Sequence, residues 1–321
     1  MKLVLAPMEG VVDFKMRQLL TDIGGFNLCV TEFVRVVEQR LPRRVFMRYC
    51  PELLNNGYTR SGTPVRIQLL GQHPQYLAEN AVKAVALGSH GVDLNFGCPA
   101  KTVNKSKGGA VLLKEPEQIY HIVKAVRDAV DESHIVSAKV RLGFDDSTRS
   151  EEIFDAVVQA KANSIAIHAR TKKDGYRPPA YWDKIAPLVA KNAPIEIVAN
   201  GEIWDLDDAI NARTQSGCKH IMLGRGALAM PDLAAWIKAS DNSREHIKLS
   251  WQDILYHIVH SSMHDDEMMS KRYFANRTKQ WLGYLKRTYT QANALFDDIR
   301  RLHDKDEVLS VLQQHAEQSP N

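Results

Sequence analysis

Short hydrophobic runs alternate with amphipathic segments along the first two thirds of the chain. The runs have strand length and are rich in β-branched residues, whereas the segments between them have the apolar spacing of helices. Eight runs occur, at 3–6, 28–31, 65–69, 91–94, 136–140, 164–168, 195–199 and 220–223. Helices are predicted near 13–22, 75–88, 116–130, 150–161, 182–192, 205–214 and 231–238. The repeated unit of strand and helix predicts a parallel sheet covered by helices.

Eight strand–helix units predict an α/β fold of the (β/α)8 type, the TIM barrel, which takes about 250 residues. A six-stranded doubly wound sheet is the alternative fold. Between the second and third runs the chain shows no regular pattern, and we expect a long irregular excursion there.

Functional groups at the ends of the runs favour the barrel. They are Met8, Glu9, Glu32, Gln68, Asn95, Lys139, His168, Asn200, Gly224 and Arg225. A parallel barrel delivers the last residues of every strand to one rim, so these groups would form one site. The turns 200–202 and 224–226 follow the seventh and eighth strands, where barrel enzymes commonly bind phosphate.

Cys98 is the candidate for chemistry at this rim. It lies three residues after Asn95, on a turn bounded by Gly97 and Pro99. A thiol on such a turn is accessible enough to act as an acid or a nucleophile. A cysteine that only fills space is the alternative.

The end of the chain predicts a second domain. After a polar linker at 239–243 the sequence is poor in Gly and Pro, and helices are predicted near 250–264, 270–288, 291–302 and 305–315. Four helices of this length can pack as a bundle. We therefore expect a barrel domain over 1–240 and an all-helical domain over 245–321.

The composition indicates the cellular compartment in which the protein is expected to act. The 321 residues carry a formal charge of +4 and four cysteines without a CxxC pair, which fits a reducing cytoplasm. No stretch approaches membrane-spanning length, so no membrane partner is expected. Three histidines, His257, His260 and His264, share one predicted helix face, but nothing completes a ligand set and no metal site is predicted.

Two basic clusters suggest a polyanionic substrate. Between 271 and 287 the chain has six Lys or Arg residues, no acidic residue, and interleaved aromatic residues. A second cluster of arginines lies at 35–48 in the excursion. Basic surfaces with interleaved aromatics are typical of nucleic-acid binding, although a basic helix face that only meets solvent is the alternative.

Several motifs together resemble the tRNA-dihydrouridine synthases over nearly the whole chain. They are the segments 6–10, 65–69, 95–99, 108–113, 139–141, 168–171, 200–202 and 224–226. The segments 31–37 and 279–285 are similar to the bacterial C subfamily, whose members act on uridine 16 of the D-loop. The resemblance implies an FMN-dependent reductase that uses NADPH and converts a uridine of tRNA to 5,6-dihydrouridine. No obligate protein partner is evident, and we expect a monomer.

The resemblance also implies the site residues. Cys98 would be the general acid that protonates C5 while FMN delivers hydride to C6. The expected FMN-binding residues are Pro7, Met8, Glu9, Gln68, Lys139, His168, Asn200, Gly201, Glu202, Gly224 and Arg225. The expected tRNA-binding residues are Arg35, Asn95, Tyr176, Arg277, Lys279, Gln280, Trp281 and Arg300.

Two positions depart from the family pattern. Ala169 stands where a Gly is usual, which adds a methyl group near the flavin. Lys161 replaces a frequent Gly before the sixth strand, so we expect that turn to avoid the left-handed conformation.

Two other functions are alternatives. A flavin reductase of a free pyrimidine, like dihydroorotate dehydrogenase, would have no use for the basic helices. A non-catalytic RNA-binding module would leave Cys98, Lys139 and the glycine turns without a role.

Overall fold

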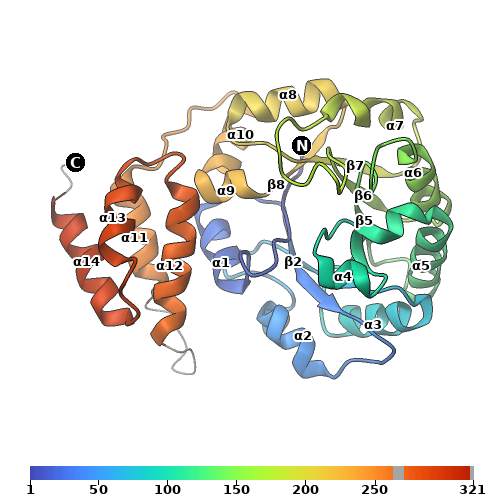
Figure 1. The fold of residues 1–321 in the computed structure, drawn as a ribbon, viewed down its shortest axis with the longest axis horizontal. Coiled ribbons are helices and arrows are strands. Elements are labelled where there is room, and N and C mark those ends of the chain that lie inside the picture. The colour runs from blue at the N-terminus through green and yellow to red at the C-terminus, as the bar shows by residue number, and fades with distance from the viewer. Residues whose placement is uncertain (263–270, 319–321) are drawn as a thin grey trace.

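The eight predicted strands form a closed parallel barrel in the computed structural model, which describes residues 1–262 and 271–318 (Figure 1). Each strand pairs with the next along the chain, and the last pairs with the first. The strands are β1 Leu3–Leu5, β2 Leu28–Arg35, β3 Val65–Leu70, β4 Val92–Asn95, β5 Val136–Arg141, β6 Ser164–His168, β7 Glu196–Asn200 and β8 His220–Leu223. The predicted barrel is confirmed, and closure excludes the doubly wound sheet, which has two open edges.

Strand β2 is the one strand that differs clearly from its prediction. It continues to Arg35, four residues beyond the predicted end at Thr31. Its register with β3 shifts between Val30 and Phe33, an irregularity that bends the strand. Glu32, which follows Thr31, interrupts the apolar pattern, so the pattern did not predict the second half of the strand.

Helices cover the outside of the barrel, close to their predicted positions. They are α1 Phe14–Ile23, α3 Pro74–Ala86, α5 Pro116–Ala129, α6 Ser150–Gln159, α7 Ala186–Ala190, α8 Leu206–Ser216 and α10 Leu233–Asp241. The Asp13 and Asp205 carboxylates cap α1 and α8 by accepting from the backbone N–H groups of Met16 and Asp208.

Short helical segments occupy several of the loops. They are α2 Arg43–Tyr49, α4 Lys101–Lys105 and α9 Arg225–Ala229, with 3-10 turns at Pro51–Asn55, Gly109–Lys114 and Trp182–Ile185. The excursion after β2 is therefore not irregular as expected, because it contains α2. That helix buries only Phe46, so its sequence shows no apolar periodicity.

The four predicted C-terminal helices are present and lie together beside the barrel, on the side of α1 and α9 (Figure 1). They are α11 Trp251–Ser262, α12 Lys271–Leu285, α13 Gln291–Ile299 and α14 Lys305–Gln318. Helix α10 ends at Asp241 and α11 begins at Trp251, so the predicted boundary at 240–245 falls at the end of α10. Within the described residues, no helix is long and apolar enough to cross a membrane.

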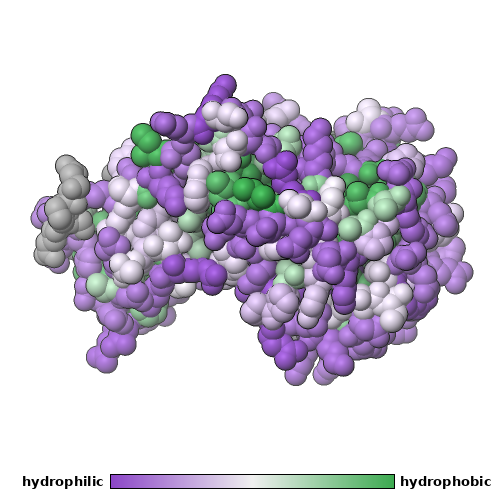
Figure 2. Space-filling model, turned by 90° about the horizontal axis from the view of Figure 1, so that it is seen from above, coloured by the Kyte–Doolittle hydropathy of each residue, from purple (hydrophilic) through white to green (hydrophobic). Residues whose placement is uncertain are grey.

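The helical domain is fixed to the barrel by α12. The buried Trp281 donates its indole N–H to the Leu228 carbonyl at 3.0 Å. Arg277 donates to the Gly10 and Val11 carbonyls at 2.6 and 2.8 Å and pairs with Asp13 at 2.5 Å. The Arg277 contacts hold the loop between β1 and α1, and the Trp281 contact holds α9. Seen from above, the largely hydrophilic surface is hollowed between the helical domain and the barrel (Figure 2).

The turn before β6 contradicts the expectation for Lys161. This residue has φ of 61°, in the left-handed region that glycine occupies without strain. It follows the end of α6, where the Ala162 N–H donates to the Val157 carbonyl at 3.3 Å and Lys161 N–H to Val158 at 2.9 Å. This hydrogen-bond pair ends many helices and requires the left-handed residue. The hydrogen bonds that end α6 therefore stabilise a left-handed backbone conformation that lysine disfavours by itself.

We predict that Lys161→Gly stabilises the protein by about 0.5–1 kcal/mol, because glycine adopts this conformation without the side-chain strain. Urea denaturation measures the free energy of unfolding. Lys161→Ala is the matched control, since it removes the same side chain but keeps a Cβ in the left-handed turn. Equal stability of the two variants would contradict the strain argument.

Candidate active site

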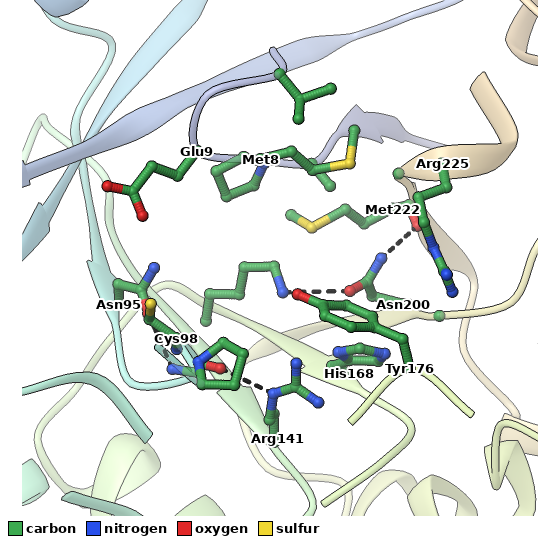
Figure 3. A pocket seen from close by; sticks show the side chains of 18 of the residues that line it. Met8, Glu9, Asn95, Cys98, Arg141, His168, Tyr176, Asn200, Met222 and Arg225 are labelled. Atoms are coloured by element: carbon green, nitrogen blue, oxygen red, sulfur yellow. Dashed lines mark hydrogen bonds between the residues drawn. The ribbon is translucent and has the colours of Figure 1, made fainter. Parts of the chain in front are cut away.

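A pocket of about 520 Å³ opens at the rim where the strands end. Its lining includes all eleven residues predicted to bind the cofactor, together with Asn95, Cys98 and Tyr176. Figure 3 shows Asn95 and Cys98 on one side of the pocket, and Asn200, Arg225, His168 and Tyr176 on the other. The structure thus brings together side chains from strands that lie far apart in the sequence.

One side of the pocket carries excess positive charge. His168 is buried, and its pKa lies well below the usual value because of burial and because Arg141, Lys139, Arg170 and Arg225 repel a further proton. A neutral imidazole surrounded by cations can donate or accept a hydrogen bond without adding charge. This region fits a ligand that carries a negative group.

Glycine is required at position 201 beside this imidazole. Gly201 has φ of 115°, and a Cβ on it would meet His168 Cδ2 at 2.7 Å. Its neighbour Glu202 accepts from Arg170, from Arg225 at 3.4 Å and from the Trp204 indole N–H at 2.8 Å. Glu202 therefore holds cationic and aromatic side chains in place around the positive region.

Lys139 lies in the pocket and forms no salt bridge with a carboxylate of the described residues. Its ammonium donates to Asn200 Oδ1 at 3.2 Å, and Asn200 Nδ2 donates to the Met222 carbonyl at 2.8 Å. Burial and the neighbouring Arg141 lower the pKa of Lys139 to about 8. An amide oxygen does not balance a buried charge, so an anionic ligand would stabilise this ammonium.

The Cys98 thiol lies on the side of the pocket opposite Asn200 and Arg225 (Figure 3). Its loop is held because Asn95 Oδ1 accepts from the backbone N–H groups of Gly97 and Cys98, both at 2.9 Å. Gly109 packs against the same loop, and a Cβ there would lie 3.0 Å from the Cys98 carbonyl oxygen. Burial raises the pKa of Cys98, so the sulfur carries its proton at neutral pH. Of the four cysteines, all within the described residues, only Cys98 is not buried.

Sequence reasoning did not identify Arg141 and Trp204, which also line the pocket. Arg141 donates from Nε to the Gly97 carbonyl at 2.8 Å and stacks on Tyr176, with 5.3 Å from its guanidinium carbon to the ring centre. Arg225 stacks between Tyr176 and Trp204, and Arg287 of the helical domain lies 4.0 Å from Trp204. Arg141 lies two residues after Lys139 on β5, so strand periodicity could have identified it. Nothing in the sequence marked Trp204.

The residues predicted to bind tRNA occupy different settings. Arg277, Gln280 and Trp281 contact the barrel, with Gln280 donating to the Gly10 carbonyl at 2.9 Å. Lys279 donates to the Leu302 carbonyl at 2.8 Å within the helical domain.

The other predicted positions lie nearer to solvent. Arg35 donates to Ser106 Oγ at 2.6 Å, and the exposed Arg300 lies 3.7 Å from Asp297. His257 and His260 lie on α11, and His264 falls outside the described residues. Within the described part of the chain, no group of three or more His, Cys, Asp or Glu residues could hold a metal ion.

Comparison with known proteins identifies close relatives. Residues 4–321 match the family model described as dihydrouridine synthase. The chain is 50% identical over 314 residues to the tRNA-dihydrouridine(16) synthase of Shewanella oneidensis, covering 98% of each chain. It is 52% identical over 306 residues to that of Pasteurella multocida, covering 95% of this chain and 96% of the relative.

A solved structure shares the fold. Histamine dehydrogenase from Rhizobium sp. 4-9 superposes with a TM-score of 0.55 at 12% identity, over 100% of this chain and 63% of that chain. At this identity the similarity concerns the barrel fold alone.

We predict that Lys139→Met stabilises the ligand-free protein by about 1–3 kcal/mol at pH 7, since a pKa lowered to about 8 means that folding disfavours the charged form. Between about pH 8 and 10.5 the unfolded wild type holds a proton that the folded protein has lost. Wild-type stability therefore rises through that window, and the advantage of the variant disappears. Denaturation at several pH values measures this difference.

Lys124→Met on the outside of α5 is the control, because that lysine is paired with Asp128 at the surface. Its effect should not change between pH 8 and 10. A Lys139→Met effect that is equally independent of pH would contradict the buried charge.

Proposed function

The chain belongs to the dihydrouridine synthase family, and from this premise we propose that it reduces a uridine of tRNA, uridine 16 of the D-loop, to 5,6-dihydrouridine. The full-length similarity to relatives named tRNA-dihydrouridine(16) synthase supports this substrate. The observation that carries the chemistry is that one pocket holds both the protonated Cys98 thiol and the cations around His168.

FMN is the cofactor that we propose for this pocket, with NADPH as the reductant. The buried Lys139 ammonium without an anionic partner and the cations around His168 fit a flavin that carries a phosphate. Asn200, Gly201, Glu202, Gly224 and Arg225, with His168, would hold the phosphate end, while Pro7, Met8, Glu9, Gln68 and Lys139 would line the ring. When bound, the flavin supplies the hydride that reduces C6 of the uracil.

Cys98 supplies the proton in this proposal. Hydride addition to the C5=C6 bond leaves an enolate, and that enolate needs a proton at C5. The raised pKa of Cys98 keeps its sulfur protonated at neutral pH, which is the state a general acid requires. Asn95 would orient the uracil beside this thiol.

The residues around the pocket mouth would bind the tRNA. Arg35, Lys279 and Arg300 would contact phosphates, and Tyr176, half exposed above the pocket, would contact the extruded nucleotide. Arg277, Gln280 and Trp281 would contribute by holding α12 against the barrel beside the hollow visible in Figure 2. We propose that the enzyme acts as a monomer in the cytoplasm, where free cysteines stay reduced.

Flavin spectroscopy tests the function. The purified protein should show the visible absorbance of oxidised flavin, NADPH should bleach it, and tRNA should restore it. Reoxidation by free uridine or orotate would instead support a reductase of free pyrimidines. A colourless protein that binds tRNA would support a non-catalytic module.

We predict that Cys98→Ala keeps its flavin and its affinity for tRNA but loses about 100-fold to 10,000-fold in turnover, because the enolate has no proton donor. Single-turnover reoxidation of the reduced enzyme by tRNA measures the step. Cys218→Ala, at a buried position away from the pocket, is the control. An undiminished single-turnover rate in Cys98→Ala would reject the acid role.

We predict that Arg300→Ala weakens tRNA binding about threefold to tenfold, because one phosphate contact is lost. The slope of log affinity against log salt concentration should become shallower by about one. Flavin content should not change. Lys124→Ala, on α5 at the far side of the barrel, removes the same charge and is the control (Figure 1). Equal tRNA affinity of the two variants would contradict the contact.

A further inference from the structure

A line of polar side chains runs along the inner face of the neighbouring strands β3 and β4 and ends at the loop that carries Cys98. It begins at Asp93 of β4, which is 2% exposed. Asp93 borders a second cavity of about 480 Å³, lined by residues from the opposite ends of the strands. Asn95 lies two residues further on β4, so both side chains point into the barrel. Nothing described so far gives Asp93 a part in the reaction.

Each hydrogen bond of this line has a defined direction. Gln68 Nε2 donates to Asp93 Oδ2 at 2.7 Å, and Asn95 Nδ2 donates to Gln68 Oε1 at 2.7 Å. Asn95 Oδ1 then accepts from the backbone N–H groups of Gly97 and Cys98. Two side chains, Gln68 and Asn95, therefore connect a buried carboxylate to the backbone of Cys98.

The carboxylate fixes that direction because it can only accept. An amide group carries a donor at one end and an acceptor at the other. With Asp93 accepting, Gln68 must turn its nitrogen toward Asp93 and its oxygen toward Asn95. Asn95 must then turn its nitrogen toward Gln68, which leaves its oxygen for the Cys98 loop. Reversing either amide would place a donor against a donor.

The other carboxylate oxygen is held separately. Ser137 Oγ donates to Asp93 Oδ1 at 2.5 Å and accepts from Arg66 at 3.1 Å. Burying a carboxylate is costly even when it is paired, and an apolar side chain would fill the same space at lower cost. A carboxylate at this position orients the amides of Gln68 and Asn95, which an apolar side chain could not do.

The orientation of the Asn95 amide also determines which hydrogen-bonding group it presents to a ligand. One of its two N–H bonds is used by Gln68, and no acceptor among the described residues takes the other. Since Asn95 lines the pocket, it presents a donor there, which matches a carbonyl oxygen of a base.

We propose that Asp93 is a positioning residue, which acts through Gln68 and Asn95 to hold the Cys98 loop where the thiol can deliver its proton. The benefit to turnover rests on the function proposed above, whereas the effect on the loop does not. The two parts can therefore be tested separately.

Two substitutions of similar size separate the acceptor from the charge. Asp93→Asn can keep an oxygen toward Gln68 while its nitrogen donates to Ser137, so the line survives without the charge. Asp93→Leu removes the acceptor as well. Both remove the negative charge of Asp93 that lies near Arg66, so a purely structural role of the carboxylate predicts similar defects in both.

Thiol reactivity reports the loop without any substrate. Because Cys98 is the one cysteine that is not buried, its reaction with 5,5′-dithiobis(2-nitrobenzoic acid) can be followed in the folded holoenzyme. The reaction should be about threefold to tenfold faster in Asp93→Leu, since the loop opens more often. In Asp93→Asn it should stay within about twofold of the wild type.

Turnover should follow the same order. Reduction of the bound flavin by NADPH should be unchanged in both variants. Reoxidation by tRNA should slow about 10-fold to 100-fold in Asp93→Leu and stay within about threefold of the wild type in Asp93→Asn, because small displacements of reacting groups are costly. If tRNA does not reoxidise even the wild type, the proposed function fails while the thiol comparison still decides the role of Asp93.

Equal behaviour of the two variants in the thiol assay would overturn the proposal, whether both match the wild type or both are equally altered. Should Asp93→Leu fail to fold, Gln68→Met interrupts the line one step later with Asp93, Ser137 and Arg66 intact. Faster thiol reaction in Gln68→Met would support the proposal, and an unchanged rate would overturn it. Only the thiol assay applies to that variant, because Gln68 also lines the proposed flavin site.

Discussion

Closure of the barrel determines where every functional side chain of this protein lies. Pairing of β8 with β1 brings the carboxyl ends of all strands to one rim, so that Cys98 after β4, Lys139 on β5 and Arg225 after β8 line one pocket. The same closure seals the interior, where Asp93 and Gln68 are removed from water. A site of this kind needs no long excursions, because short steps beyond each strand already converge.

The site combines groups that are costly to bury. Lys139 has a lowered pKa because of its burial and the neighbouring Arg141, and Asp93 has a raised pKa because burial outweighs its hydrogen bonds. In a structure selected for stability alone, both positions would favour apolar residues. The first charge fits a function in binding an anionic ligand, and the second fits the proposed function of orienting two amides beneath the thiol.

Much of the fold could be predicted from the sequence because the barrel repeats one simple pattern. All eight strands were located, and the pocket contains every residue expected at the flavin. The second half of β2 was missed because Glu32 interrupts its apolar pattern, and helix α2 was missed because its apolar residues follow no helical period. The contacts of Trp281, Arg277 and Trp204 could not be foreseen, because they depend on how the helical domain meets the barrel. Lys161 shows that a helix end can impose a conformation against residue preference.

The proposed reaction at the rim of this barrel removes the C5=C6 double bond of one uridine in the D-loop of tRNA. It can be tested by mapping dihydrouridine in tRNA from cells that lack this protein. We expect dihydrouridine to disappear at position 16 alone and to return when the wild-type chain is supplied. Unchanged dihydrouridine at position 16 in those cells would contradict it.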